Sequence, residues 1–125
     1  MNGKVLKQFF NGKNAKQKAL NWLNDNVHPL AVKFDVEITV QLSVDFDTWR
    51  FGGLGTNYHS HSVDLFSAEQ ARGWVWGANW HSHASGCCDV FSPDDVKVFN
   101  RYASSNITFH MSYQGLDGKG HLVNF

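Results

Sequence analysis

One stretch constrains the fold more than any other: an apolar run that ends in two histidines and leads into a helix start. Residues 73–80 read Gly-Trp-Val-Trp-Gly-Ala-Asn-Trp, which favours a β-strand. His81 and His83 follow this run directly. Because residues two apart in a strand point to the same face, we expect both imidazoles on one side of a sheet.

A helix is expected to begin one short loop later. Ser92 suits the N-cap and Pro93 the first helical position, and two acids, Asp94 and Asp95, fall in the first turn. An acid at the third helical position can turn its carboxylate back toward the end of the preceding strand. The sequence therefore predicts that Asp95 approaches the two histidines.

His81, His83 and Asp95 form a ligand set that suits zinc. Three protein ligands leave a fourth tetrahedral position for water, which is the layout of a catalytic rather than a closed structural site. An isolated His-x-His is common on protein surfaces, and Ser-x-x-Asp alone is a variant capping box. The combination of strand end, short loop, capped helix and acid is what indicates a metal site.

Two other motifs are weaker candidates for metal. His59 and His61 form a second His-Ser-His, but no capped helix with an acid follows at the same spacing, so a polar strand face is the simpler interpretation. The only two cysteines, Cys87 and Cys88, are adjacent. Adjacent cysteines rarely bridge, so we expect free thiols that pack in the loop beside the site, in a reducing compartment.

Composition narrows the class of protein. A chain of 125 residues predicts one domain with a substantial core. Eleven basic and eleven acidic residues balance, so no polybasic surface indicates nucleic acid or membrane as a partner. No apolar run approaches the ~20 residues of a membrane span. Residues 1–4 lead into no hydrophobic signal region, and we expect a cytoplasmic protein.

The pattern along the chain predicts a single α+β domain over residues 14–125, a mixed β-sheet flanked by helices, after an N-terminal arm of residues 1–13. The helix that starts at Asn14 is expected to end at His28-Pro29, because the residue before proline avoids the helical region. The other expected strands are at 32–44, 48–51 and 58–66, with a turn at 45–47 and a flexible or tightly turned link at 52–55. A short helix is expected at 67–72, a helix at 93–103, and a hairpin of strands 107–113 and 121–125 around Asp117-Gly118.

His81-Ser82-His83, followed by Ser92-x-x-Asp95, resembles the motif of the JAMM (MPN/JAB) metalloproteases. That motif consists of a glutamate, a gap, His-Ser/Thr-His, a short loop and Ser-x-x-Asp. The helix, strand and hairpin after the motif are similar to those of small prokaryotic or bacteriophage members, and the resemblance covers most of the chain beyond residue 14. It implies an MPN/JAB-like fold for residues 14–125 and zinc as the cofactor.

The resemblance also implies roles for two further residues. Glu37 precedes His81 by 44 residues, about the gap of small family members, and would be the general base. Taken alone, Glu37 is more simply a solvent-facing residue of an alternating strand. Ser92 would hydrogen-bond the developing oxyanion or a ligand, or it only caps its helix. Glu69, the one other glutamate, is a poorer candidate base.

The sequence departs from the family pattern in the loop. Eight residues separate His83 from Ser92, where the family usually has seven, and Ala84 stands where it usually has proline. Counting from His83 selects Asp94 as the third ligand, and counting from Ser92 selects Asp95. We choose Asp95, because its offset from Ser92 is set by helix geometry while the loop can absorb one residue.

The expected function is that of a zinc-dependent peptidase or isopeptidase. The resemblance implies hydrolysis of an amide bond at the C-terminal tail of a ubiquitin-like or sulfur-carrier-type protein, which would be the protein partner. The alternative is a catalytically idle MPN-type module that binds a partner protein. The position of Glu37 relative to the ligands separates the two hypotheses.

Overall fold

Six strands form one mixed sheet in the part of the chain that the structure describes. The structure, a computed structural model, describes residues 9–56, 73–83, 93–102 and 106–125. Its elements, in chain order, are β1 (Phe9–Phe10), α1 (Ala15–Asn26), α2 (His28–Phe34), β2 (Ile38–Asp45), β3 (Thr48–Gly55), β4 (Val75–Ser82), α3 (Pro93–Arg101), β5 (Thr108–Gln114) and β6 (Gly120–Asn124).

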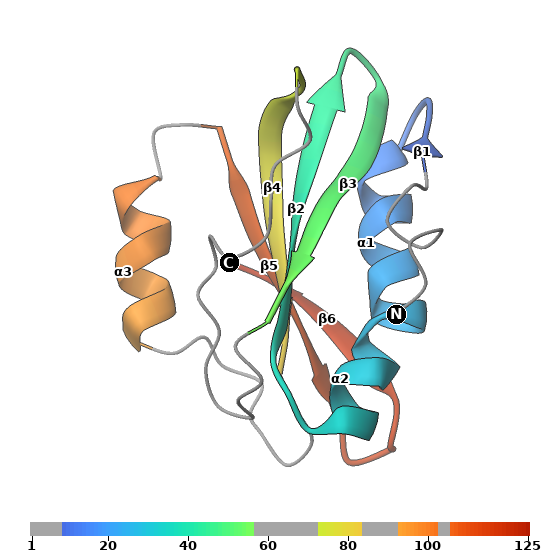
Figure 1. The fold of residues 1–125 in the computed structure, drawn as a ribbon, viewed down its shortest axis with the longest axis vertical. Coiled ribbons are helices and arrows are strands. Elements are labelled where there is room, and N and C mark those ends of the chain that lie inside the picture. Colours follow the sequence, from blue (N-terminus) through green and yellow to red (C-terminus); the bar gives the residue numbers. More distant parts are fainter. Residues whose placement is uncertain (1–8, 57–72, 84–92, 103–105) are drawn as a thin grey trace.

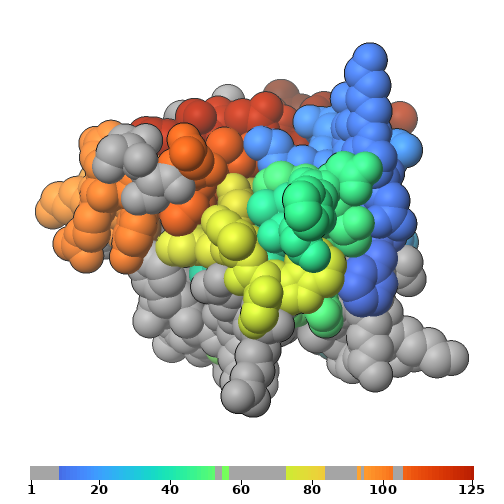
Figure 2. Space-filling view, turned by 90° about the horizontal axis from the view of Figure 1, so that it is seen from above, coloured from blue at the N-terminus to red at the C-terminus, as the bar shows by residue number. Residues whose placement is uncertain are grey.

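The strand order is β1–β3–β2–β4–β5–β6. Neighbouring strands are antiparallel except β4 and β5, which run parallel with His81 opposite Met111. A parallel pair needs a crossover connection, and α3 lies in the segment that joins these two strands. α1 and α2 lie on one side of the sheet and α3 on the other (Figure 1). The view from above shows α3 and the N-terminal segment on either side of β2 and β4 (Figure 2).

The larger core lies between α1, α2 and one face of the sheet. Apolar residues recur at helical spacing in α1 and alternate with polar ones in β2, so one stripe of the helix meets one face of the strand. Trp80 is its largest fully buried side chain. Its buried members are Ala19, Leu20, Leu23, Val27, Ala31, Ile38, Val40, Leu42, Phe51, Ala78 and Trp80.

A smaller core holds α3 against the opposite face. The rings of Phe99 and Phe109 stack with their centroids 4.2 Å apart, and Trp76 packs edge-on against Tyr102 and Phe109. Residues four apart share one side of a helix, so Asp95 lies one turn before Phe99 on the same side of α3. The stacked rings therefore help to set the position of the Asp95 carboxylate.

A β-bulge in β4 lets this strand serve both cores. Leu42 pairs with Ala78 and Ser43 with Trp76, so Gly77 is an extra residue on β4. The bulge places the Trp76 side chain with α3, although Ala78 packs into the larger core. A Cβ on Gly77 would lie 2.6 Å from the Trp49 ring, which is why a glycine is needed there.

The expected helix end at His28-Pro29 and strand start at Val32 are wrong. α1 ends at Asn26, and a second helix runs from His28 to Phe34 before Asp35 adopts a left-handed conformation with φ 53°. Proline is tolerated in the first turn of a helix, where its missing N–H is not needed, so Pro29 starts α2 rather than ending α1.

The expected flexible link at 52–55 is also wrong. β3 continues through these residues to Gly55, which pairs with Thr39 on β2. Glycine weakens a strand but does not forbid it where a neighbouring strand supplies the hydrogen bonds. The expected turn at 45–47 is confirmed, with Phe46 at φ 55°. The expected hairpin within 107–125 is confirmed as well, because β5 pairs antiparallel with β6.

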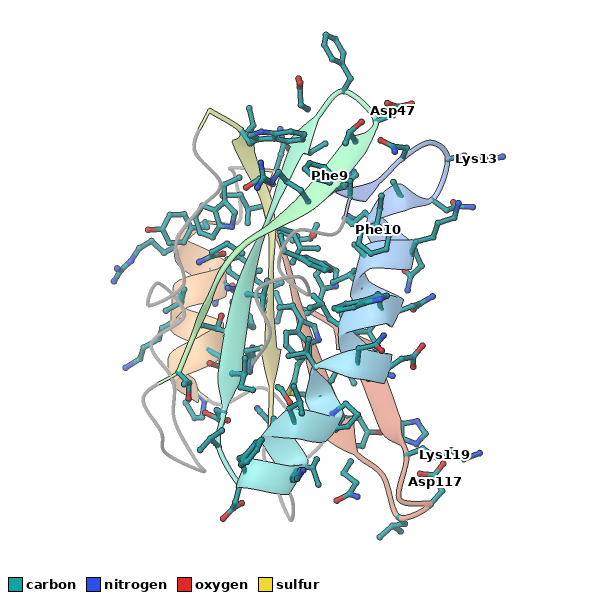
Figure 3. The ribbon with its side chains drawn as sticks, turned by 45° about the vertical axis from the view of Figure 1, so that its right-hand side comes forward. Phe9, Phe10, Lys13, Asp47, Asp117 and Lys119 are labelled. Carbon is teal, nitrogen blue, oxygen red and sulfur yellow. The ribbon has the colours of Figure 1, made fainter. Side chains whose placement is uncertain are left out.

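β1 attaches the end of the expected N-terminal arm to the sheet. Phe9 and Phe10 pair with Arg50 and Trp49 of β3, and Phe10 packs against the larger core (Figure 3). The remainder of the arm, the expected strand at 58–66 and the helix at 67–72 lie outside the described residues. Over the described ranges, none of the helices has both the length and the apolar character needed to cross a membrane.

Candidate metal centre

The two histidines of the ligand set lie at one end of β4. His81 is the penultimate residue of the strand, and the backbone N–H of His83 donates to the carbonyl of Ser112 on β5 at 2.9 Å. Both side chains are buried, and their Nε2 atoms lie 3.3 Å apart. Strand alternation thus brings the two imidazoles together on the α3 side of the sheet, as expected from their spacing.

Asp95 reaches this pair from the first turn of α3. Its Oδ2 atom lies 3.4 Å from His81 Nε2, and the side chain is 15% exposed. One ligand atom from each of His81, His83 and Asp95 lies within 4.8 Å of the others. The described residues therefore bring together the three predicted ligands, contributed by the end of one strand and the start of one helix.

The two distances from His81 to the other ligands suit a tetrahedral ion. Ligand atoms about 2.0–2.2 Å from zinc, at tetrahedral angles, lie roughly 3.3–3.6 Å from each other. The distances of 3.3 Å between the two Nε2 atoms and 3.4 Å between His81 Nε2 and Asp95 Oδ2 fall in this range. Two imidazoles and one carboxylate are also ligands that zinc prefers, so the residues present fit the ion.

Glu37 lies beside the ligand group and not in solvent. It directly precedes β2, is 6% exposed, and places Oε1 3.7 Å from His83 Nε2. Burial, and after it the negative charge of Asp95, raises the pKa of the Glu37 carboxyl from 4.5 to about 7. A carboxyl with a pKa near neutrality can both accept and return a proton, which is the requirement for a general base that later acts as an acid.

Several predicted site residues lie outside the described residues. These are Ser92, the pair Cys87 and Cys88, and the second His-Ser-His pair, His59 and His61. The side chain of Asp94 is likewise not described, so the approach of Asp95 to His81 is the direct observation on the third ligand.

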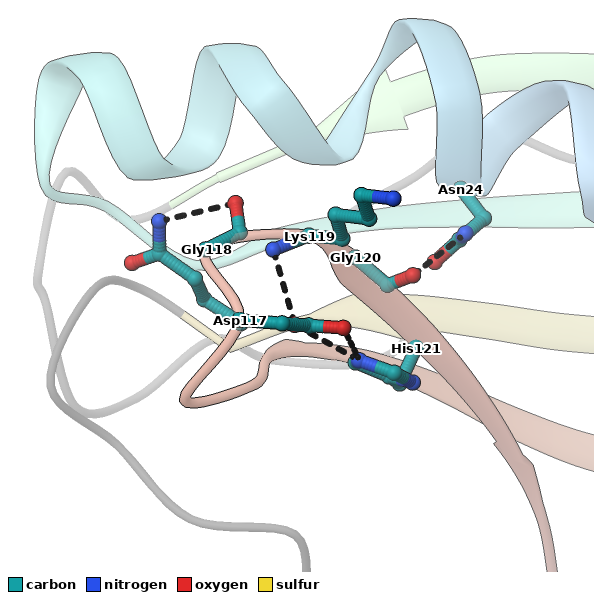
Figure 4. Close-up of polar contacts among 7 residues, drawn as sticks. Asn24, Asp117, Gly118, Lys119, Gly120 and His121 are labelled. Carbon is teal, nitrogen blue, oxygen red and sulfur yellow. Dashed lines mark hydrogen bonds and ion pairs between the residues drawn. The ribbon is translucent and has the colours of Figure 1, made fainter.

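His110 and His121, in the last two strands, make other contacts. His110 is buried in β5, with Nδ1 2.6 Å from Asn124 Oδ1 and Nε2 2.7 Å from Thr108 Oγ1. His121 in β6 lies 2.9 Å from Asp117 of the hairpin turn (Figure 4). The hydrogen bond from His121 is the main reason that the pKa of Asp117 is lowered.

Sequence reasoning missed one buried histidine next to the centre. His28, the first residue of α2, is 2% exposed and places Nδ1 2.5 Å from the hydroxyl of Ser82. Burial, and then the neighbouring His83, lowers the pKa of His28 to about 4, so the ring is neutral at pH 7. Ser82 could have indicated such a partner. A residue between two ligands in a strand faces the other side of the sheet, and a buried hydroxyl there needs a polar partner.

No family model, curated protein or solved structure matches this chain. Its function is therefore inferred from the chemistry of the centre. That chemistry comprises two buried imidazoles, a carboxylate from a helix start, and a second carboxyl whose pKa is shifted toward neutrality.

Proposed function

We propose that the chain is a zinc-dependent metallopeptidase of the JAMM type, which hydrolyses an amide or isopeptide bond. The observation that carries the proposal is the convergence of His81, His83 and Asp95 within 4.8 Å, with both distances from His81 in the range of a tetrahedral ion. Three protein ligands leave one position for water or substrate, as in catalytic zinc sites.

In this proposal, zinc would polarise the scissile carbonyl and acidify the attacking water. Glu37 is the general base: its carboxylate takes a proton from that water and delivers it to the leaving amine. Its burial and its distance of 3.7 Å from His83 Nε2 support this role. Ser92, the residue before Pro93 in the sequence, is proposed to donate a hydrogen bond to the oxyanion that forms on the substrate.

The proposed substrate is the C-terminal tail of a ubiquitin-like or sulfur-carrier-type protein. This part of the proposal is supported by the resemblance of His81-Ser82-His83 and Ser92-x-x-Asp95 to the JAMM motif, and by Glu37 at the matching distance upstream. The alternative, a catalytically idle MPN-type binding module, has no need for a base at the ligands. The buried carboxyl of Glu37 beside His83 favours the enzyme.

The test measures zinc content and hydrolysis on the same preparations. Protein purified without chelator should carry about one zinc per chain by elemental analysis, and should cleave fluorogenic amide or isopeptide substrates built on ubiquitin-like tails. Glu37→Gln should keep its zinc and lose about 10²–10⁴ in rate, because a general base contributes that much. Glu69→Gln is the matched control and should cleave like the wild type.

Ligand variants complete the experiment. Asp95→Ala should release zinc, whereas Asp94→Ala and the double change His59→Ala with His61→Ala should retain it. A wild-type protein that takes up no zinc would overturn the metallopeptidase proposal. A zinc-loaded wild type that binds ubiquitin-like proteins but cleaves none of them would instead favour the binding module, and equal rates for wild type and Glu37→Gln would remove Glu37 from the mechanism.

A further inference from the structure

Ser82 links the metal centre to the opposite face of the sheet. It lies between His81 and His83, so its side chain points away from the ligands and toward α2. Its hydroxyl donates to the carbonyl oxygen of His83 at 3.4 Å and lies 2.5 Å from Nδ1 of His28. His28 and Ser82 are both buried, so water does not compete for this hydrogen bond.

His28 is held in place from its other side by the start of β6. A Cβ on Gly120 would lie 2.8 Å from Cδ2 of His28 and 3.0 Å from Oδ1 of Asn24, so the absence of a side chain at Gly120 makes room for the ring. Asn24 of α1 donates from Nδ2 to the Gly120 carbonyl at 3.1 Å (Figure 4). The imidazole is thus fixed between β6 and the end of β4.

If His28 served only to fill space, it would be an unfavourable choice of residue at this position. Its Nε2 is buried and has no hydrogen-bond partner among the described residues, and an unpaired buried polar atom lowers stability. A phenylalanine ring would fill similar space without an unpaired atom. What His28 offers that a phenylalanine would not is therefore the hydrogen bond between its Nδ1 and Ser82.

We propose that His28 is a positioning residue of the metal centre: by holding Ser82, it fixes the end of β4 so that His81 and His83 keep the spacing that zinc requires. This inference rests on the proposed zinc function. Ligands must be held within about 0.5 Å of the productive geometry, and residues that orient them typically contribute 10–100-fold in metal affinity. Ser82 acts on both ligands at once, because it is covalently joined to each.

The test measures zinc affinity by competition with a chromophoric chelator and the visible absorption spectrum of the cobalt-substituted protein. The cobalt spectrum reports the geometry of the ligands, which a change in overall stability alone does not alter. His28→Phe should weaken zinc binding about 10–100-fold and change the cobalt spectrum. His28→Asn should restore most of the affinity and the spectrum, because its amide lies where Nδ1 lies and can donate or accept a hydrogen bond.

A double-mutant cycle separates positioning from packing. Ser82→Ala should resemble His28→Phe, and the double variant should be little worse than either, since both remove the same hydrogen bond. His110→Phe is the matched control: it removes another buried, hydrogen-bonded histidine, on β5, and should leave zinc affinity and the cobalt spectrum unchanged.

Three outcomes would contradict the positioning role of His28 or its physical basis. Wild-type affinity and spectrum in both His28→Phe and Ser82→Ala would overturn the positioning role while leaving the zinc centre intact. Equal losses in His28→Asn and His28→Phe would show that ring packing, and not the hydrogen bond, is what matters. A wild-type protein that binds neither zinc nor cobalt would refute the proposed metal function itself, and the positioning role with it. If His28→Phe does not fold, wild-type affinity and spectrum in Ser82→Ala alone would overturn the positioning role. A loss in His28→Asn as large as that in Ser82→Ala would then show that the hydrogen bond of the amide does not replace that of the ring.

Discussion

At the scale of single residues, Glu37 has the largest chemical consequence. The same carboxyl that suits a general base is energetically unfavourable in its charged form, because it is 6% exposed and close to Asp95. Both effects raise its pKa, to about 7 in the metal-free protein. In the metal-free protein, Glu37 is therefore mostly protonated below this pH and mostly ionised above it. A bound cation would favour the ionised form at lower pH.

This titration can be observed directly, since the chain contains only Glu37 and Glu69 as glutamates. Protein labelled with ¹³C at the glutamate carboxyl should give two NMR signals, and Glu69→Gln assigns them. In metal-free protein, the Glu37 signal should titrate with a midpoint near 7. Asp95→Asn should lower that midpoint, because it removes a neighbouring negative charge, and zinc should lower it further. A midpoint near 4.5 in the metal-free wild type would contradict the buried placement.

Local geometry explains which site residues could be predicted. The approach of His81 to His83 follows from strand alternation, and that of Asp95 from a capped helix start, and each rule spans only a few residues. The contact between His28 and Ser82 joins residues 54 apart in sequence and depends on how α2 packs on the sheet. No local pattern specifies such a contact, so it became visible only in the fold.

At the scale of elements, the centre depends on how α3 is attached. α3 carries Asp95, and its packing on the sheet rests on the small cluster around Phe99 and Phe109. α1 instead contributes to the larger core on the other face, which includes Phe51 of β3. A loss of packing in one core should therefore affect zinc binding differently from the same loss in the other.

Two identical substitutions test this difference. Phe99→Leu and Phe51→Leu each replace a buried ring, at 1% and 0% exposure, and each should lower the free energy of unfolding by about 1–2 kcal/mol. Only Phe99→Leu should also weaken zinc binding severalfold, because α3 then holds Asp95 less firmly. Denaturant unfolding measures the first effect and chelator competition the second. Equal zinc affinities in the two variants would show that Asp95 is positioned independently of this cluster.

The elements themselves were predictable where the pattern was periodic. The alternating strand that became β5 and the hairpin at Asp117-Gly118 needed only local rules. The boundary at α2 was missed because Pro29 is compatible with either a helix end or a helix start, and packing of the buried His28 and Ala31 favoured the start. The glycines at 52–55 were assigned to a link, since their pairing with β2 is a tertiary effect.

At the scale of the whole molecule, the sheet has two covered faces and the centre lies where three elements meet. The starts of β2 and α3 and the end of β4 place four ionisable side chains together, two histidines and two acids. An α+β domain with a mixed sheet was expected, and the structure has this architecture. The strand order and the parallel pairing of β4 with β5 were not predictable, because they depend on contacts between distant segments.

Such a centre lowers the stability of the metal-free fold. The pKa of Glu37 is about 7 in the folded protein against an ordinary value of 4.5, so the folded state binds the proton more tightly than the unfolded chain. This tighter proton binding favours folding: its contribution to the free energy of unfolding is fully present below pH 4.5 and is lost as the pH rises through 7. Above pH 7 the folded protein must hold an ionised carboxyl that is buried near Asp95.

Removing this charge should therefore stabilise the metal-free protein in a pH-dependent way. At pH 8 in the presence of a chelator, Glu37→Gln should be more stable than the wild type by roughly 3 kcal/mol, the value of a shift of about 2.5 pH units. The difference should become much smaller at pH 4.5, where Glu37 is protonated in the folded wild type and half protonated in the unfolded chain. Saturating zinc should also reduce it, because a cation beside Glu37 compensates the buried carboxylate. Urea unfolding at the two pH values, with chelator and with zinc, measures all three. A pH-independent advantage of Glu37→Gln would mean that its effect comes from packing and not from the buried charge.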